Sequence, residues 1–341
     1  MVPEIQLPID ICAELRKNTA AIINHLAVPV DEPGQWRRRS HAPSIVLVLE
    51  RSGAISASGI LDWYERNQVE GVELIVVEGI GSEIRGDPMW DDIPLYMFDE
   101  GEFDDVSQDL AKQIDDPDHP MYLEAERVAA ALARLPDGGH TVGLIDDYVS
   151  RGHVAAIYTP IFFRKAAARA GYGLAEYADI AWPVMEDVKY HLNLGEFQHS
   201  NQFSKRSPAL ACKAMEANLQ GTRSLSFPWE NVWTLLPSFD QWMPAIAAAT
   251  FGPSPLSDSH QYELNEWLRG GQQFSWWRSD GDNPYVDWVP EHSAAMRVVT
   301  ALGVDPADAP GYLQSLSLRL RQKIVDSTRE TRWTAPKGET T

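Results

Sequence analysis

Three short apolar runs without polar alternation predict strands that are covered on both faces. They are residues 44–50 (SIVLVLE), 72–77 (VELIVV) and 140–145 (HTVGLI). Runs of this kind are typical of parallel sheets, in which helices pack on both sides. Between the first two runs, residues 54–68 (AISASGILDWYERNQ) have helical spacing of apolar positions. Strand, helix and strand in this order predict a βαβ unit.

Further helices are predicted where apolar residues recur every three or four positions. The helix after the acidic segment ends at a Pro-Asp-Gly-Gly sequence, and the one after the third strand ends at Gly171, a residue suited to a helix C-cap. The helix nearest the N-terminus leads into a Pro- and Arg-containing connector at residues 31–43. The predicted helices span residues 12–28, 121–135, 160–170, 261–268, 291–302 and 311–328.

These elements predict an α/β fold with a largely parallel central sheet and flanking helices. The sheet domain is expected at residues 41–178, after an N-terminal helix and connector at 1–40. Within it, residues 78–120 are acidic and rich in Gly and Pro, which suggests an insertion or a mobile loop. Residues 179–330 form a tryptophan-rich, mostly helical region, and residues 331–341 a tail. The tryptophans suit either a second core or a base-stacking pocket, and the sequence leaves both open.

Charge and cysteine content narrow the range of partners. The 341 residues carry 49 acidic and 29 basic side chains, a formal charge of −20 that disfavours general binding to nucleic acid or to anionic membranes. Cys12 and Cys212 are too few for a disulfide framework and too far apart for a zinc site. There is neither a signal-peptide pattern nor an apolar run of about 18 residues, so a cytoplasmic protein is expected.

The candidate chemistry lies where the predicted strands end. Asp146 and Asp147 follow the third run, and Arg51, Ser52 and Gly53 follow the first. In open α/β sheets, ligands bind beyond the carboxyl ends of the strands. Neighbouring carboxylates suit the binding of vicinal sugar hydroxyls or of Mg²⁺, and glycine lets the backbone approach an anion closely.

This combination resembles the type I phosphoribosyltransferase family over about residues 43–173. In that family an apolar strand runs into two acidic residues, a hydroxyl- and glycine-rich loop and a helix, as in residues 142–154 (VGLIDDYVSRGHV) with the helix ending at Gly171. The upstream pyrophosphate loop of the family is similar to Arg51-Ser52-Gly53 and the helix that follows. The segment at 78–119 would take the place of the mobile catalytic loop.

The resemblance implies a role for each matching residue. As the catalytic pair, Asp146 and Asp147 would hold the ribose hydroxyls. Through the ligand they would also hold the Mg²⁺ cofactor. Arg51, Ser52 and Gly53 would bind the pyrophosphate. The residues that would surround the 5′-phosphate are Tyr148, Val149, Ser150, Arg151, Gly152, His153 and Val154. The implied function is transfer of ribosyl phosphate from a phosphoribosyl pyrophosphate-type ligand to an acceptor that the sequence does not identify. The expected partner is a phosphorylated ribose or nucleotide, with a second copy of the chain as an additional candidate.

Two other hypotheses follow from the same residues. Arg151, Gly152, His153 and Val154 replace the family's usual Thr-Gly-Gly-Thr, which favours a nucleotide-binding or regulatory protein that keeps the fold without catalysis. The acidic pair would alternatively hold Mg²⁺ directly in a metal-dependent hydrolase.

Overall fold

The described part of the chain in the computed structural model comprises residues 2–30, 34–49, 52–78, 80, 100–136, 139–146, 154, 158–172, 224–226, 232–235, 239–251 and 301–329. None of its helices is both long and apolar enough to cross a membrane. Its mixed α/β content with parallel strands agrees with the predicted fold class.

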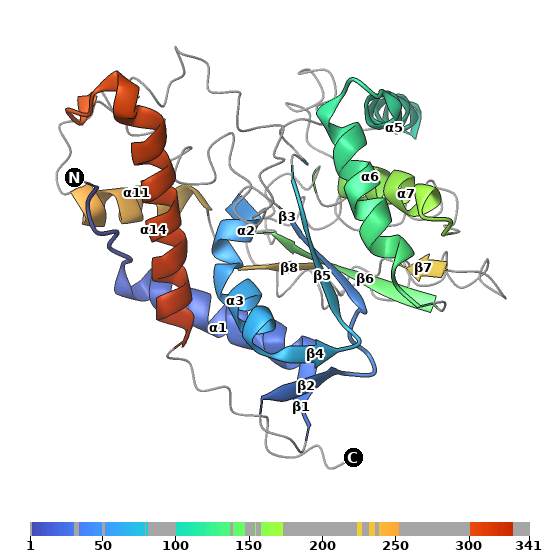
Figure 1. The fold of residues 1–341 in the computed structure, drawn as a ribbon, viewed down its shortest axis with the longest axis horizontal. Helices are drawn as coiled ribbons and strands as arrows, with labels where there is room; N and C mark the ends of the chain where they lie inside the picture. Colours follow the sequence, from blue (N-terminus) through green and yellow to red (C-terminus); the bar gives the residue numbers. More distant parts are fainter. Residues whose placement is uncertain are drawn as a thin grey trace.

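A parallel sheet lies at the centre of the structure (Figure 1). Its strands are β5 (Glu73–Val77), β3 (Ile45–Leu49) and β6 (Gly139–Asp146), in that spatial order. Two short strands, β7 (Ser224–Ser226) and β8 (Val232–Thr234), pair in parallel with successive halves of β6. Every residue of β3 is buried, which explains the absence of polar alternation in its sequence. The three predicted strands are thus confirmed.

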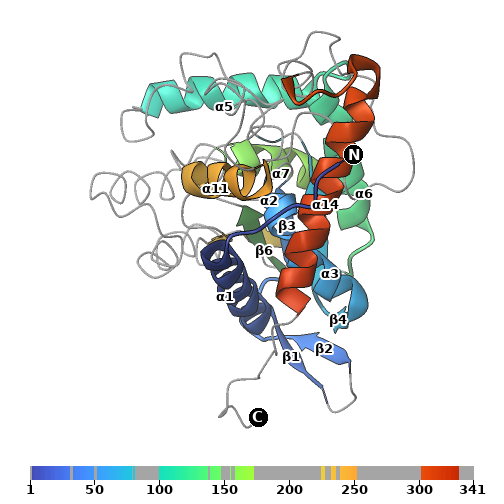
Figure 2. The same cartoon turned by 90° about the vertical axis from the view of Figure 1, so that its left-hand side faces the viewer.

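One face of the sheet is covered by helices from distant parts of the chain. These are α1 (Ile9–Leu26), α3 (Ser58–Arg66) and α14 (Ala309–Arg329), with α11 (Phe239–Phe251) beside them (Figure 2). Their apolar side chains form one buried cluster with those of the sheet. The short helix η4 (Pro306–Asp308) precedes α14. Strand β8 and helix α14 lie in the predicted tryptophan-rich region, and both contribute to this shared sheet and core.

Helices α3 and α14 pack unusually closely at Gly59. A Cβ atom placed on Gly59 would lie 2.9 Å from both Cβ and Cγ2 of Thr328, and closer still to its Oγ1. The hydroxyl of Thr328 donates to the carbonyl oxygens of Ile324 (3.0 Å) and Val325 (2.9 Å) within α14. Asp62 of α3 adds an ion pair to Arg329 at the end of α14. The small size of Gly59 therefore sets the distance between the two helices.

The other face of the sheet carries α5 (Glu100–Asp115), α6 (Pro120–Ala133) and α7 (Thr159–Arg169). Arg169 connects the three helices: its guanidinium lies 4.4 Å from the ring centre of Tyr122 and donates to the carbonyl oxygens of Tyr122 (3.1 Å) and Ile114 (2.8 Å). Gly171 ends α7 with φ +81°, a conformation that favours glycine. Helices α6 and α7 were predicted, whereas α5 lies inside the acidic segment at 78–120 and was not.

A second, three-stranded sheet lies beside the C-terminal end of α3. Strand β2 (Gln35–Arg38) pairs antiparallel with β1 (Ala27–Pro29) and parallel with β4 (Gln68–Glu70). Strand β2 belongs to the segment that was predicted to be a connector, and that prediction is wrong for these four residues. The indole of Trp36 packs edge-on against Trp63 of α3, with ring centres 5.0 Å apart. This tertiary contact holds β2 in place.

Candidate functional site

The strand order creates a natural position for a ligand. From β3 the chain passes through α2 (Ser52–Ser56) and α3 to β5 on one side of β3, and the later strand β6 lies on the other side. The connections therefore diverge between β3 and β6. Open α/β sheets bind ligands at such a switch point, in the crevice outside the carboxyl ends of the two strands. The registers of Ile45 with Val142 and of Val48 with Ile145 show that β3 and β6 run side by side to this edge.

The first predicted loop leaves the sheet at the carboxyl end of β3. Strand β3 ends at Leu49, and Ser52 is already the first residue of α2. Gly53 is buried, and its carbonyl oxygen accepts a hydrogen bond from the backbone N–H of Ala57 (2.8 Å). Helix α2 also contacts β6. Helix α2, which includes Ser52 and Gly53, thus lies beside the neighbouring strand, while Arg51 is outside the described residues.

The second predicted loop leaves the same edge at the carboxyl end of β6. Asp146 is the last residue of β6 and is only 8% exposed. Its carbonyl oxygen accepts a hydrogen bond from the N–H of Leu235 (3.2 Å), and the Leu235 carbonyl accepts one from the side chain of Asn18 in α1 (2.7 Å). The backbone of Asp146 is therefore fixed by β8 and, through Leu235, by α1.

The rest of the second loop lies mostly outside the described part of the chain. Val154 is half-buried, and helix α7 begins at Thr159 with Pro160 in its first turn, as a proline with fixed φ favours. The hydroxyl of Thr159 is buried and has no hydrogen-bond partner among the described residues. The predicted site residues of this loop that lie outside the described residues are Asp147, Tyr148, Val149, Ser150, Arg151, Gly152 and His153.

A buried polar network at the end of β5 was missed by the sequence analysis. Glu78 directly follows β5, is buried, and donates its backbone N–H to Oε1 of Glu124 in α6 (2.8 Å). Arg127 pairs with the same Glu124 oxygen at 2.5 Å and also donates to the carbonyl oxygen of Val76. The signal was present in the sequence, because each of the three apolar runs ends at or is followed by an acidic residue: Glu50, Glu78 and Asp146. The edge that would face a ligand thus has buried acidic residues at the ends of β5 and β6.

The carboxylates at the strand ends are the candidate ligands for a metal ion. Among the described residues, no group of three or more His, Cys, Asp or Glu side chains is arranged to hold a metal ion. Asp146 supplies one carboxylate of the proposed pair. A magnesium ion bound through a ligand pyrophosphate needs few protein ligands, since the phosphate oxygens and water fill most of its coordination sphere. The indirect role of Asp146 and Asp147 toward Mg²⁺ stays a prediction.

The comparisons with known proteins add no relative: no protein-family model matches the chain, and neither the curated proteins nor the solved structures give a match.

Proposed function

We propose that the protein is a phosphoribosyltransferase-like enzyme, a glycosyltransferase that binds a phosphoribosyl pyrophosphate-type ligand with Mg²⁺ at the switch point between β3 and β6. One observation carries the proposal. Strands β3 and β6 are parallel neighbours, so the loops at 51–53 and 146–154 leave the sheet at the same edge. The family's pyrophosphate loop and ribose-phosphate loop require this juxtaposition, and the order of elements along the chain agrees with it.

Each loop would bind a different part of the ligand. The carboxylates of Asp146 and Asp147 accept hydrogen bonds from the two ribose hydroxyls, and ionised carboxylates are strong acceptors for this purpose. Backbone N–H groups around Gly53 bind the pyrophosphate, because glycine permits close approach of the main chain. The 5′-phosphate lies against residues 148–154 and near the N-terminus of α7, where the helix dipole favours an anion.

The reaction places few demands on protein nucleophiles. The bond between the anomeric carbon and a pyrophosphate oxygen breaks, pyrophosphate leaves with the electron pair, and a new bond forms from the acceptor to that carbon. Mg²⁺, when bound with the ligand, would neutralise part of the pyrophosphate charge. The residues of the chain position the ribose and stabilise the developing charge, and such preorganised electrostatic stabilisation is a large share of enzymatic rate enhancement.

Calorimetric titration with phosphoribosyl pyrophosphate and Mg²⁺ tests binding, and release of pyrophosphate in the presence of purine and pyrimidine bases tests turnover. We expect binding by the unaltered protein and at least a tenfold loss in an Asp146→Asn, Asp147→Asn double variant. Asp109→Asn is the matched control, since Asp109 is exposed on α5, where it pairs with Lys112. Asp146 is buried, so a second variant tests binding without changing a buried carboxylate. Ser150→Ala, a milder change in the loop, should also weaken binding.

The outcomes separate the three hypotheses. Binding with pyrophosphate release supports the transferase. Binding without release for any base overturns catalysis and favours a nucleotide-binding regulator. No binding at all, with Asp146→Asn and Asp147→Asn behaving like the control, overturns the family resemblance.

A further inference from the structure

Residues 2–8, which we call the strap, form an extended segment outside any helix or strand. The strap runs beside α11 and α14 before the chain enters α1, as Figures 1 and 2 show. Its burial alternates along the chain: Ile5 is 1% exposed, whereas its neighbours Glu4 and Gln6 are exposed. Val2 and Leu7 are half-buried and pack against the core. The strap therefore lies on the protein in the manner of a bound peptide.

Side chains of both helices hold the backbone of the strap. Arg319 of α14 donates to the carbonyl oxygens of Val2 (3.1 Å) and Pro3 (3.3 Å). The hydroxyl of Thr250 in α11 accepts a hydrogen bond from the N–H of Gln6 (3.1 Å). These contacts involve main-chain atoms of the strap, so they suit any extended segment and do not select its sequence.

Two side chains of the strap give its contact surface a sequence preference. Ile5 belongs to the buried cluster to which α11 contributes Trp242 and α14 contributes Leu320. Buried anchors of this kind carry most of the energy of an interface. Glu4, directly before the anchor, forms an ion pair with Lys323 of α14 (3.1 Å). An exposed ion pair adds little affinity, but it favours one sign of charge over the other.

The strap is attached less firmly than the helices that it covers. Its hydrogen bonds to α11 and α14 are exposed, and Ile5 is the one residue of the strap that is buried. Segments with few buried contacts and exposed hydrogen bonds open locally at a small cost in free energy. The strap can therefore leave its contact surface while α11 and α14 stay folded.

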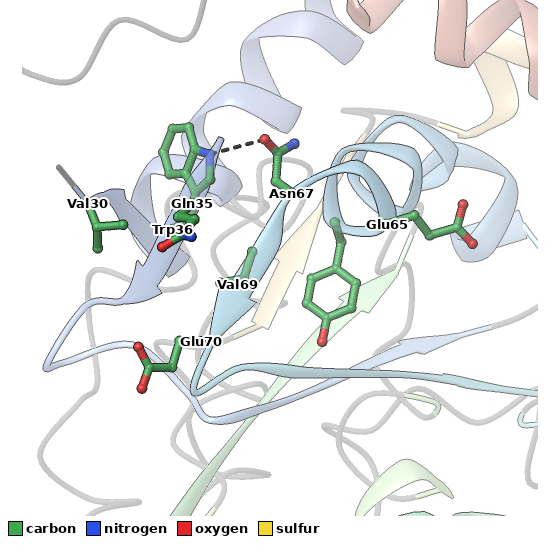
Figure 3. A pocket seen from close by; sticks show the side chains of 8 residues that line it. Val30, Gln35, Trp36, Glu65, Asn67, Val69 and Glu70 are labelled. Atoms are coloured by element: carbon green, nitrogen blue, oxygen red, sulfur yellow. Dashed lines mark hydrogen bonds between the residues drawn. The ribbon is translucent and has the colours of Figure 1, made fainter. Parts of the chain in front are cut away.

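The hollow on the three-stranded sheet does not offer a comparable site. It has a volume of about 560 Å³, and its lining includes Trp36, Val69 and Glu70 (Figure 3). The strand register pairs Trp36 with Val69 but Glu70 with Arg37, so the carboxylate lies on the opposite face of the sheet from the apolar pair. Its polar and apolar groups therefore do not face one ligand.

We propose that the contact surface of the strap is a peptide-recognition site, which the chain's own residues 2–8 occupy in this structure. Its external ligand is an extended protein segment in which an acidic residue directly precedes an isoleucine or a similar apolar residue. Arg319 and Thr250 bind the backbone of that segment, Lys323 binds its carboxylate, and its apolar residue takes the place of Ile5. The strap competes with this ligand, so a partner binds by displacing it. The inference does not depend on the function proposed above.

Fluorescence polarisation with a labelled peptide of residues 2–8 (VPEIQLP) measures binding to the full-length chain. The unaltered chain should bind the peptide weakly, because its own strap competes at a high effective concentration. Ile5→Asp removes the anchor of the strap, and this chain should bind the peptide at least tenfold more tightly. Ile9→Asp is the matched control: Ile9 is 89% exposed, so this chain should behave like the unaltered one.

A second variant tests displacement without changing a buried residue. Glu4→Lys in the full-length chain alters only an exposed side chain and removes the ion pair with Lys323. This chain should bind the unaltered peptide about threefold more tightly than the unaltered chain does. An affinity that stays unchanged in Glu4→Lys, or in a folded Ile5→Asp chain, overturns the proposal.

A charge exchange tests the assigned ligand chemistry. With the Ile5→Asp chain, a peptide carrying Glu4→Lys should bind about fivefold more weakly than the unaltered peptide. Adding Lys323→Glu to that chain should reverse this preference, because the two charges are then exchanged. The same peptide order with and without Lys323→Glu would overturn recognition of the carboxylate by Lys323.

Discussion

The close crossing of α3 and α14 makes Gly59→Ala a sharp test of the fold. The new methyl group would meet three atoms of Thr328 at or below 2.9 Å, distances that real Cβ atoms do not adopt. Thr328 has little freedom to move away, because it is 2% exposed, β-branched, and hydrogen-bonded to two carbonyl oxygens of its own helix. The two helices must therefore separate, which disturbs the apolar contacts around them.

The expected magnitude combines two opposing effects. Overpacking of a well-filled core costs about 1–3 kcal/mol, and three short contacts place this site toward the upper end. Replacing glycine by alanine in a helix returns about 1 kcal/mol of helix propensity. The net loss in the free energy of unfolding should be about 1–2 kcal/mol. Chemical denaturation followed by tryptophan fluorescence and circular dichroism measures it.

Two companion variants separate packing from propensity. Gly311→Ala in the first turn of α14 meets no atom within 4 Å, so it should be neutral or stabilising by up to about 1 kcal/mol. Thr328→Gly removes all three atoms in the contact. It should therefore cost about 1–2 kcal/mol less stability in the Gly59→Ala background than it costs in the unaltered protein. A Gly59→Ala variant as stable as Gly311→Ala, without coupling to Thr328, would refute the described helix crossing.

Two further predictions concern charged groups. Burial raises the pKa of Asp62, but hydrogen bonds from Arg329 and Arg66, together with the charges of both, lower it more. The pKa of Asp62 in the folded protein therefore lies below its ordinary value. The stabilisation by Asp62 should be complete above about pH 4 and be lost as the pH falls through the folded pKa. The free energy of unfolding, measured between pH 3 and 7 for the unaltered protein and for Asp62→Asn, should converge at acidic pH. A difference that stays constant with pH would contradict this. Glu124→Gln should lower the free energy of unfolding by about 1–3 kcal/mol, because it removes the buried carboxylate that pairs with Arg127. Glu126 is half-exposed on the same helix, so Glu126→Gln should cost less than about 1 kcal/mol. The same denaturation assay measures both.

The sequence predicted the elements whose patterns arise from their own burial. Strands β3, β5 and β6 are apolar because helices cover both faces, and α14 shows helical spacing because one side packs on the core. Strand β2 is different: its residues Gln35–Arg38 alternate between exposed and half-buried, and what makes them a strand is pairing with β1 and β4 and contact with Trp63. Three-residue strands such as β7 and β8 are too short to leave a pattern.

Helix α5 was missed for a related reason. Its sequence, EGEFDDVSQDLAKQID, has acidic composition typical of a loop, yet Leu110 and Ile114 are fully buried one helical turn apart. At the candidate site, the position of Asp146 at a strand end was predictable from an apolar run that stops at a carboxylate. The contact of Glu124 with the N–H of Glu78 was not, because it joins residues 46 positions apart on different elements.

The covering of one face of the sheet by both α1 and α14 has a consequence for how the chain reaches its folded state. Ile11 and Leu15 of α1 share a core with Leu320 and Ile324 of α14. Leu26 at the end of α1 and Ala309 at the start of α14 are roughly 280 positions apart, an interval that takes on the order of 15–60 s to synthesise at about 5–20 residues per second. Until α14 is made, α3 lacks the helix that packs against it at Gly59. Exposed apolar surface is prone to aggregation, so protection of this surface by chaperones during translation would raise the yield of soluble protein.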